Sequence, residues 1–260
     1  IRRLQYYNYK TNPVYNFPYD IYYINMNKNY DRRLYMEKQL NRLCRKYKRI
    51  EGVNGYKINN ILEDEVDGIK FINDYPKLTK GEIGCILSHF TAIKKAYKDK
   101  EDVVMICEDD VCFDTIGIIP NIKDICNNAP EDWEILQLIS NIGTNDKNVK
   151  YIRREKNGSI FASCYLINRK GMKNILDVVF EHDNILRIKE ISEGYPSLGV
   201  ADEYIYEINK TYIVTPSLFF VNNLDLESTI HSDHTESHLR LMLNNIKTLI
   251  KALEDRKNSN

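Results

Sequence analysis

Long apolar runs are missing from this sequence. No stretch of its 260 residues approaches the roughly 20 apolar residues of a membrane-spanning helix, so we expect no membrane span. The N-terminus also lacks the apolar segment of a signal peptide, although the chain begins with Ile1 rather than Met. We expect a cytoplasmic protein, and a luminal location stays open if a targeting segment has been removed.

An excess of charge of one sign is absent as well. Lys+Arg and Asp+Glu number 37 each, which gives a formal net charge of zero. Binding that depends on nucleic-acid phosphates needs a basic surplus or a strong basic patch, so we expect no nucleic-acid partner. The first 19 residues interleave tyrosines with Arg2, Arg3 and Lys10, but an irregular arm that packs its tyrosines on the core explains them better than single-stranded nucleic acid does.

Paired cysteine motifs are also missing. The six cysteines form no CxxC pair and no zinc-ligand spacing, and several lie in apolar runs, where Cys is usually a small core residue. We expect reduced thiols in a reducing compartment. Internal repeats and low-complexity linkers are absent too, so the chain length suits one large domain or two small lobes.

Strand and helix patterns alternate along the chain. Apolar residues at helical spacing predict a helix through Met36, Leu40, Leu43 and Tyr47, and Thr79-Lys80-Gly81-Glu82 is a capping box that opens another. The segments with strand character are 20–25, 47–56, 103–107, 133–139 and 159–168, and a further helix follows the last of them. Such alternation predicts an α/β domain with a mostly parallel sheet.

The C-terminal segment, 233–260, has a different pattern. Its apolar residues follow a 4-3-4-3 spacing, which predicts a helix with a narrow apolar seam. Docking on the body of the same chain and a homodimer both stay open. The residues of this seam are Leu239, Leu243, Ile246, Ile250 and Leu253.

The stretch "VVMICEDDVCFD", residues 103–114, runs from a buried-looking strand into three carboxylates, Glu108, Asp109 and Asp110. Ligands of open α/β sheets bind outside the carboxyl ends of the strands. Adjacent carboxylates repel one another, and no Lys or Arg lies within five residues on either side. A divalent cation with oxygen ligands, Mn2+ or Mg2+, is the natural partner. It could take Glu108 and Asp110 on an extended chain, or Asp109 and Asp110 if the chain turns.

The order of several motifs is more specific than the acids alone. "INMNKNYDRR", "RIEGVNG", "LTKGEIGCILSH" and "ICEDDV" follow one another, and "FASCYLINRKGMKNIL", "GVADEYI" and "TPSLF" come later. Over residues 20 to 232 this series resembles glycosyltransferase family 25, which includes lipooligosaccharide and collagen galactosyltransferases. The AT-rich style of the composition would suit a giant virus, and then a host-cell cytoplasm.

The resemblance implies a GT-A-type, Rossmann-like fold that binds UDP-galactose or UDP-glucose with a divalent metal. It implies Asp110 as a direct metal ligand and Glu108 or Asp109 as the second, with His231, or as second choice His234, completing the shell. Asp109 is also implied as a contact of the donor. Asp202 is the candidate base, although an Asp at a helix start is also a common N-cap. The residues implied as donor contacts are Asn25, Arg32, Arg33, Asn54, Gly55, Ser88 and His89.

Several of these residues could instead have a purely structural role. At least one of Arg32 and Arg33 would lie on a solvated helix face, and His89 could be a satisfied core histidine. The acceptor is a saccharide or a collagen-type hydroxylysine, and the sequence does not separate the two. Two other functions stay open, a non-catalytic sugar-nucleotide-binding scaffold that dimerises through its last helix and a metal-dependent phosphoesterase.

Overall fold

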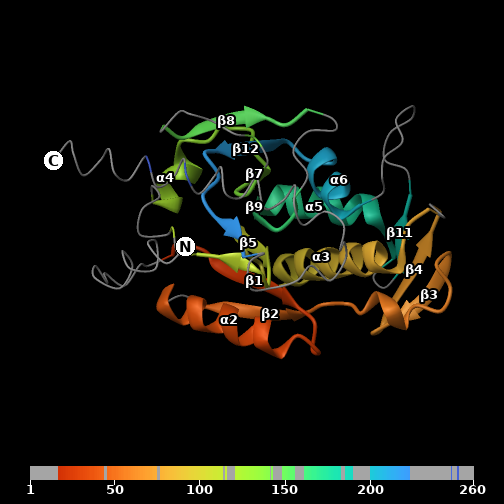
Figure 1. Cartoon of the computed structure of the whole chain (residues 1–260). Helices are drawn as coiled ribbons and strands as arrows, with labels where there is room; N and C mark the ends of the chain where they lie inside the picture. The colour runs from red at the N-terminus through yellow and green to blue at the C-terminus, as the bar shows by residue number, and fades with distance from the viewer. Residues whose placement is uncertain are drawn as a thin grey trace.

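A computed structural model describes residues 17–43, 46–74, 77–113, 115, 121–140, 142, 148–155, 161–182, 185–189, 200–222, 247 and 251. Its centre is a seven-stranded sheet, which Figure 1 shows from β2 at the bottom to β8 at the top. In spatial order the strands are β2 (Tyr47–Glu51), β1 (Asp20–Asn25), β5 (Val103–Glu108), β9 (Cys164–Asn168), β7 (Ile135–Gln137), β12 (Thr211–Thr215) and β8 (Lys150–Arg153).

Most strands of this sheet run the same way. β1 pairs in parallel with β2 and β5, and β7 pairs in parallel with β12. Only β9 and β8 are antiparallel to their neighbours in this sheet. The predicted fold class, an α/β arrangement with a mostly parallel sheet flanked by helices as in GT-A-type folds, is therefore confirmed.

Helices cover both faces of the sheet, as the alternation of residues along β1 requires. Ile21 and Tyr23 pack with residues of α2 (Tyr30–Leu40) and α4 (Ile122–Asn127). Tyr22 and Ile24 pack on the opposite face with residues of α3 (Lys80–Lys98), α5 (Arg169–Val179) and α6 (Ala201–Glu207).

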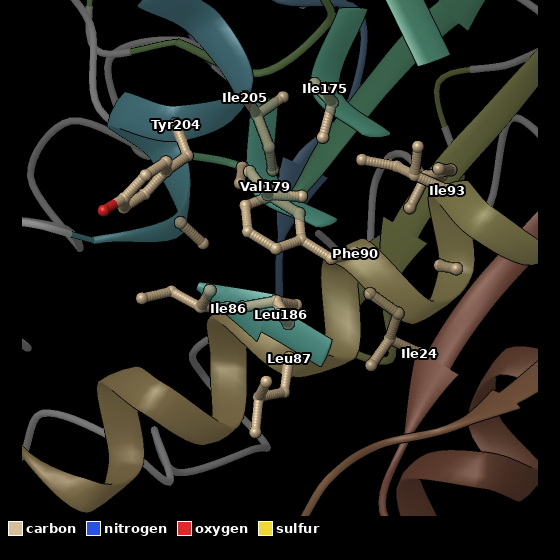
Figure 2. Packing of buried hydrophobic residues seen from close by; sticks show 14 of the residues in the cluster. Ile24, Ile86, Leu87, Phe90, Ile93, Ile175, Val179, Leu186, Tyr204 and Ile205 are labelled. Carbon is tan, nitrogen blue, oxygen red and sulfur yellow. The ribbon is translucent and has the colours of Figure 1, made fainter. Parts of the chain in front are cut away.

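Helix α3 is the centre of the larger core. The predicted capping box is present, with Thr79 as the N-cap and Glu82 bonding back to it. Phe90 lies among side chains of α5 and α6 (Figure 2), and its ring meets that of Tyr204 edge-on with centroids 5.8 Å apart. Burying a large aromatic ring contributes roughly 1.5–3 kcal/mol, so this contact helps to fix the helix that carries Ser88 and His89.

Two smaller sheets were not predicted. β3 (Glu63–Val66), β4 (Ile69–Asn73), β11 (Ile185–Ile188) and β10 (Phe180–His182) form a four-stranded sheet at one end of α3 (Figure 1). β6 (Val111–Cys112) and β13 (Phe220–Val221) form a two-stranded ribbon. These strands are short, and β3 exposes most of its side chains, so neither length nor apolar alternation marks them.

Several predicted boundaries were wrong. The first helix ends at Leu40 and continues as the 3-10 turn η1 (Asn41–Leu43), so its predicted extension to Tyr47 was wrong. The strand predicted over 47–56 begins at Tyr47, whose backbone pairs with Ile21, but it ends at Glu51. The strand predicted over 159–168 begins only at Cys164, since Phe161 has a φ of 128° that no regular strand contains.

Some predictions concern parts of the chain outside the described residues. These include most of the arm before residue 20, the metal candidates His231 and His234, and all five residues of the C-terminal seam. The division into arm, body and last helix therefore stays a prediction. Within the described part, five cysteines form no disulfide, and none of the helices there has the length and apolar character needed to cross a membrane.

Candidate functional site

A pocket opens at the carboxyl ends of β1, β2 and β5, beside the first half of α3. This is the edge of an open α/β sheet at which ligands bind. The residues lining it are Ile24, Met26, Asn29, Arg32, Gly52, Val53, Asn54, Gly55, Tyr56, Gly81, Gly84, Cys85, Ser88, His89, Glu108, Asp109 and Asp110. The structure thus brings together eight of the predicted site residues from four segments of the chain.

The chain turns directly after β5, as a cation bound by Asp109 and Asp110 would require. One guanidinium nitrogen of Arg32, Nη2, lies 2.7 Å from Oδ1 of Asp109 and 2.5 Å from Oδ2 of Asp110. Asn25 Nδ2 donates to the other oxygen of Asp109 at 2.7 Å, and Arg49 Nε donates to Asn25 Oδ1 at 2.9 Å. No Lys or Arg lies close to the acids in sequence, and Arg32, which is distant in sequence on α2, supplies part of the positive charge that they need.

Arg32 carries one positive charge, so it offsets only one of the three negative charges that Glu108, Asp109 and Asp110 carry when ionised. Burial raises the pKa of Asp110 to about 7, opposed by Arg32 and reinforced by the charges of Glu108 and Asp109. Oδ1 of Asp110 is buried and has no hydrogen-bond partner among the described residues. An unpaired buried oxygen is unfavourable, so this atom fits a cation that approaches from the side opposite Arg32. The acids thus fit a divalent metal, with Asp110 as its most available ligand.

Glu108 faces a different set of partners. His89 Nε2 lies 3.5 Å from Glu108 Oε1, and His89 Nδ1 lies 3.1 Å from the hydroxyl of Tyr165. Burial would raise the pKa of Glu108, but hydrogen bonds from His89 and Ser163 and the charges of His89 and Arg32 lower it overall. A Cys85 sulfur, a His89 ring nitrogen and a Glu108 oxygen all lie within 4.8 Å of one another, which is another place where a metal could bind.

The loop after β2 forms the wall opposite the acids. Val53 N–H donates to Ser88 Oγ at 2.8 Å, and Ser88 Oγ donates to the carbonyl of Gly84 at 2.6 Å. A Cβ on Gly55 would lie 1.9 Å from the carbonyl oxygen of Lys80, so the loop approaches α3 more closely than any other residue would allow. Asn54 accepts from Tyr56 N–H and caps the 3-10 turn η2 (Gly55–Lys57).

Asp202 lies in the first turn of α6 but is not its N-cap, which is Val200. Its Oδ2 accepts from the backbone N–H of Phe161 at 2.7 Å. Burial raises its pKa, the Phe161 hydrogen bond opposes this, and Glu108 adds to it. Its bond to Phe161 also supports a strained backbone, since Phe161 has a φ of 128°.

Arg33 is the predicted donor contact that the structure places elsewhere. Its Nε bonds Glu37 at 2.8 Å on an exposed part of α2, so it is the arginine of the solvated face. Sequence reasoning missed Arg49, Cys85 and Tyr165. Only Cys85 carried a signal, since Cys85 and His89 are four residues apart on one predicted helix.

The fold and the pocket define a class of α/β protein with an acidic, metal-compatible site at the edge of its sheet. The family model described as glycosyltransferase family 25 (LPS biosynthesis protein) matches residues 19–186, more than half of the chain. The chain therefore belongs to glycosyltransferase family 25, and the predicted family is confirmed.

Curated relatives agree with the family. The chain is 28% identical over 171 residues to procollagen galactosyltransferase 1-A of Xenopus laevis, covering 61% of this chain and 28% of that protein. It is 30% identical over 128 residues to procollagen galactosyltransferase 2 of Mus musculus, covering 46% of this chain and 20% of that protein. The chain spans less than a third of the length of these relatives.

Proposed function

We propose that this chain transfers galactose or glucose from a UDP-sugar to a hydroxyl acceptor with the help of a divalent cation, Mn2+ or Mg2+. The observation that carries the proposal is Asp110, whose buried Oδ1 has no hydrogen-bond partner in the described chain and which lines the pocket at the sheet edge. A diphosphate carries about two negative charges and approaches carboxylates only when a cation lies between them.

The residues in and around the acidic cluster would have different roles. Asp110 would hold the cation, and Arg32 and Asn25 fix Asp109 beside it. The cation would stabilise the negative charge that develops on the leaving UDP. Arg32 lies close enough to the acids to contact the same diphosphate. The loop at Val53, Asn54 and Gly55 would hold the nucleoside, because its backbone is fixed against α3.

Asp202 is the proposed base for the acceptor hydroxyl. A base needs an affinity for the proton that suits neutral pH, and burial raises the pKa of this carboxyl. The inverted product expected of the family requires one in-line displacement, in which the acceptor oxygen bonds to the sugar as UDP leaves. The acceptor's proton then passes to Asp202.

The names of the relatives favour galactose as the sugar and a collagen-type hydroxyl as the acceptor. A saccharide acceptor is the alternative, as the family description includes lipopolysaccharide biosynthesis. A cytoplasmic location is proposed on the sequence argument alone.

A donor screen tests the proposal. The purified chain is incubated with Mn2+ and each of several UDP- and GDP-sugars, and released nucleotide is measured with and without a hydroxylysine peptide or a galactoside. We expect release from UDP-galactose or UDP-glucose, lost in Asp110→Asn. No release and no thermal stabilisation by any UDP-sugar with Mn2+ would overturn the proposal.

A further inference from the structure

The ribbon of β6 and β13 extends by one residue pair beyond its assigned strands. Phe220 pairs with Cys112, and Val221 with Val111, in antiparallel register. In the same register the backbone N–H of Asn222 donates to the carbonyl oxygen of Asp110 at 2.8 Å. Residues that oppose each other in an antiparallel pair project their side chains from the same face, with Cβ atoms about 4.5–5.5 Å apart. Asn222 therefore stands beside the acid that the proposed function places on the cation.

Asp110 and Asn222 share one unfavourable feature. Asp110 Oδ1 and Asn222 Oδ1 are buried, and neither has a hydrogen-bond partner among the described residues. Asn222 is only 7% exposed, so bulk water does not compensate its amide. When Asp110 is ionised, both oxygens only accept hydrogen bonds, so they cannot satisfy each other. What satisfies both at once is a donor or a cation between them.

The chemistry of the pair favours a cation. A carboxylate oxygen and an amide carbonyl oxygen are typical ligands of hard divalent ions. Arg32 already bonds Asp110 Oδ2, so the guanidinium occupies one oxygen and leaves Oδ1 for another partner. Arg32 carries one positive charge and bonds both Asp109 and Asp110, so these two carboxylates keep an excess of negative charge when both are ionised.

We infer that Asn222 is a direct ligand of the divalent cation, through its side-chain carbonyl oxygen and together with Asp110. This inference rests on the metal-dependent function proposed above. It assigns a ligand from the residue that follows β13, a part of the chain that the acidic motif does not include. The cation then joins the start of β6 to the end of β13.

Metal binding measured without turnover tests the inference. The full chain is stripped of metal with a chelator, and free Mn2+ is titrated by electron paramagnetic resonance, with and without UDP. Asn222→Ala is expected to weaken Mn2+ binding on the order of tenfold or more, whereas Asn222→Asp, which keeps an oxygen at the same place, is expected to bind at least as tightly as the natural chain.

Asn209→Ala is the matched control. Asn209 is buried to a similar extent, but its amide donates at 2.9 Å to the carbonyl of Ile205 in α6, so Asn209→Ala is expected to lower stability and leave Mn2+ affinity unchanged. Circular dichroism establishes that each variant is folded. If Asn222→Ala does not fold, Asn222→Asp carries the test, and weaker Mn2+ binding by that folded variant overturns the inference.

The remaining outcomes separate the inference from the function on which it rests. Mn2+ binding by Asn222→Ala within twofold of the natural chain overturns the role of Asn222 and leaves the proposed function standing. Equal weakening in Asn222→Ala and Asn222→Asp indicates a structural amide and also overturns it. If the natural chain binds no Mn2+ with or without UDP, both the proposed function and the inference fail.

Discussion

The hydroxyl of Ser88 on α3 accepts a hydrogen bond from the backbone N–H of Val53, at 2.8 Å. Both groups are buried, and the bond holds the pocket loop against the helix. Sequence reasoning placed Ser88 among the donor contacts. The geometry gives it a positioning role, because its oxygen is already used by Val53 and Gly84.

Removing this hydroxyl tests that role. Ser88→Ala leaves the Val53 N–H buried and unpaired, so we expect a loss of about 1–3 kcal/mol in the free energy of unfolding. Urea denaturation measures it. Thr91→Ala is the matched control, since Thr91 Oγ1 only donates to the carbonyl of Leu87 in its own helix at 2.7 Å. Equal losses in the two variants would contradict the positioning role.

The close approach of Gly55 to Lys80 predicts a larger effect. A methyl group at Gly55 cannot occupy a point 1.9 Å from a backbone oxygen, so the loop must move away from α3. Gly55→Ala is expected to lower stability by more than about 2 kcal/mol and to weaken UDP binding. Thermal unfolding and UDP titration measure the two effects.

Gly68 offers the comparison for Gly55. It has a φ of 79° and open space around its Cα, so Gly68→Ala meets only backbone strain. We expect it to cost about 1 kcal/mol and to leave UDP affinity unchanged. A Gly55→Ala variant that binds UDP like the natural chain would show that the loop tolerates displacement.

Arg32 and Arg33 are neighbours in sequence with opposite expected effects. Arg32→Ala removes the guanidinium shared by Asp109 and Asp110, and we expect transfer activity to fall at least roughly tenfold. Arg33→Ala breaks only an exposed ion pair with Glu37, which is worth about 0–1 kcal/mol, so activity should change little. Steady-state rates with a UDP-sugar compare them, and similar losses in both would place Arg33 at the donor after all.

Asp99 at the end of α3 predicts a dependence of stability on pH. Hydrogen bonds from Lys48, Lys95 and Tyr22 hold the pKa of Asp99 well below its usual range. Because the folded pKa is lower than the unfolded one, the stabilisation is present above about pH 4 and is lost as the pH falls toward the folded pKa. Lys48 is 38% exposed, so solvent screening limits the effect to about 1 kcal/mol.

Asp99→Asn should therefore be less stable than the natural chain near pH 7, and the difference should shrink toward about pH 3. Urea unfolding at both pH values measures it. Asp177→Asn, which removes only an exposed ion pair with Lys173, should make little difference at either pH. A difference for Asp99→Asn that grows on acidification would contradict the sign of the pKa shift.

Local signals explain why the fold was largely predictable. The capping box at Thr79 and the continuous apolar run 103–107 are each formed by a few adjacent residues. The helix and the strand that they predict, α3 and β5, form where expected. β3 has no such local pattern, because three of its four side chains are acidic and the strand forms only by pairing with β4. The predicted end of the first helix was wrong because a residue distant in sequence decides the conformation of Tyr47, whose backbone pairs with Ile21.

Eight residues that line the pocket were predicted, but their contacts with one another were not. Residue types and strand position pointed to Glu108, Asp109 and Asp110, but their division between two sets of partners depends on where the chain turns. Arg32 reaches the acids from α2, and Asn222 faces Asp110 through a register that no local pattern encodes. Contacts of this kind are set by packing, so sequence reasoning could not choose between Arg32 and Arg33.

Asp202 gives the sharpest test of the proposed chemistry, because its two roles can be separated. Asp202→Asn keeps a carbonyl oxygen that can accept from Phe161 N–H, so the backbone there should hold, but it cannot take a proton. We expect kcat to fall about 10²–10⁴-fold with little change in the KM for the donor, since the base acts in the transition state. Asp202→Ala removes the acceptor as well and should also lower the melting temperature. If Asp202→Asn keeps its activity while Asp202→Ala loses stability, Asp202 supports Phe161 and another group is the base.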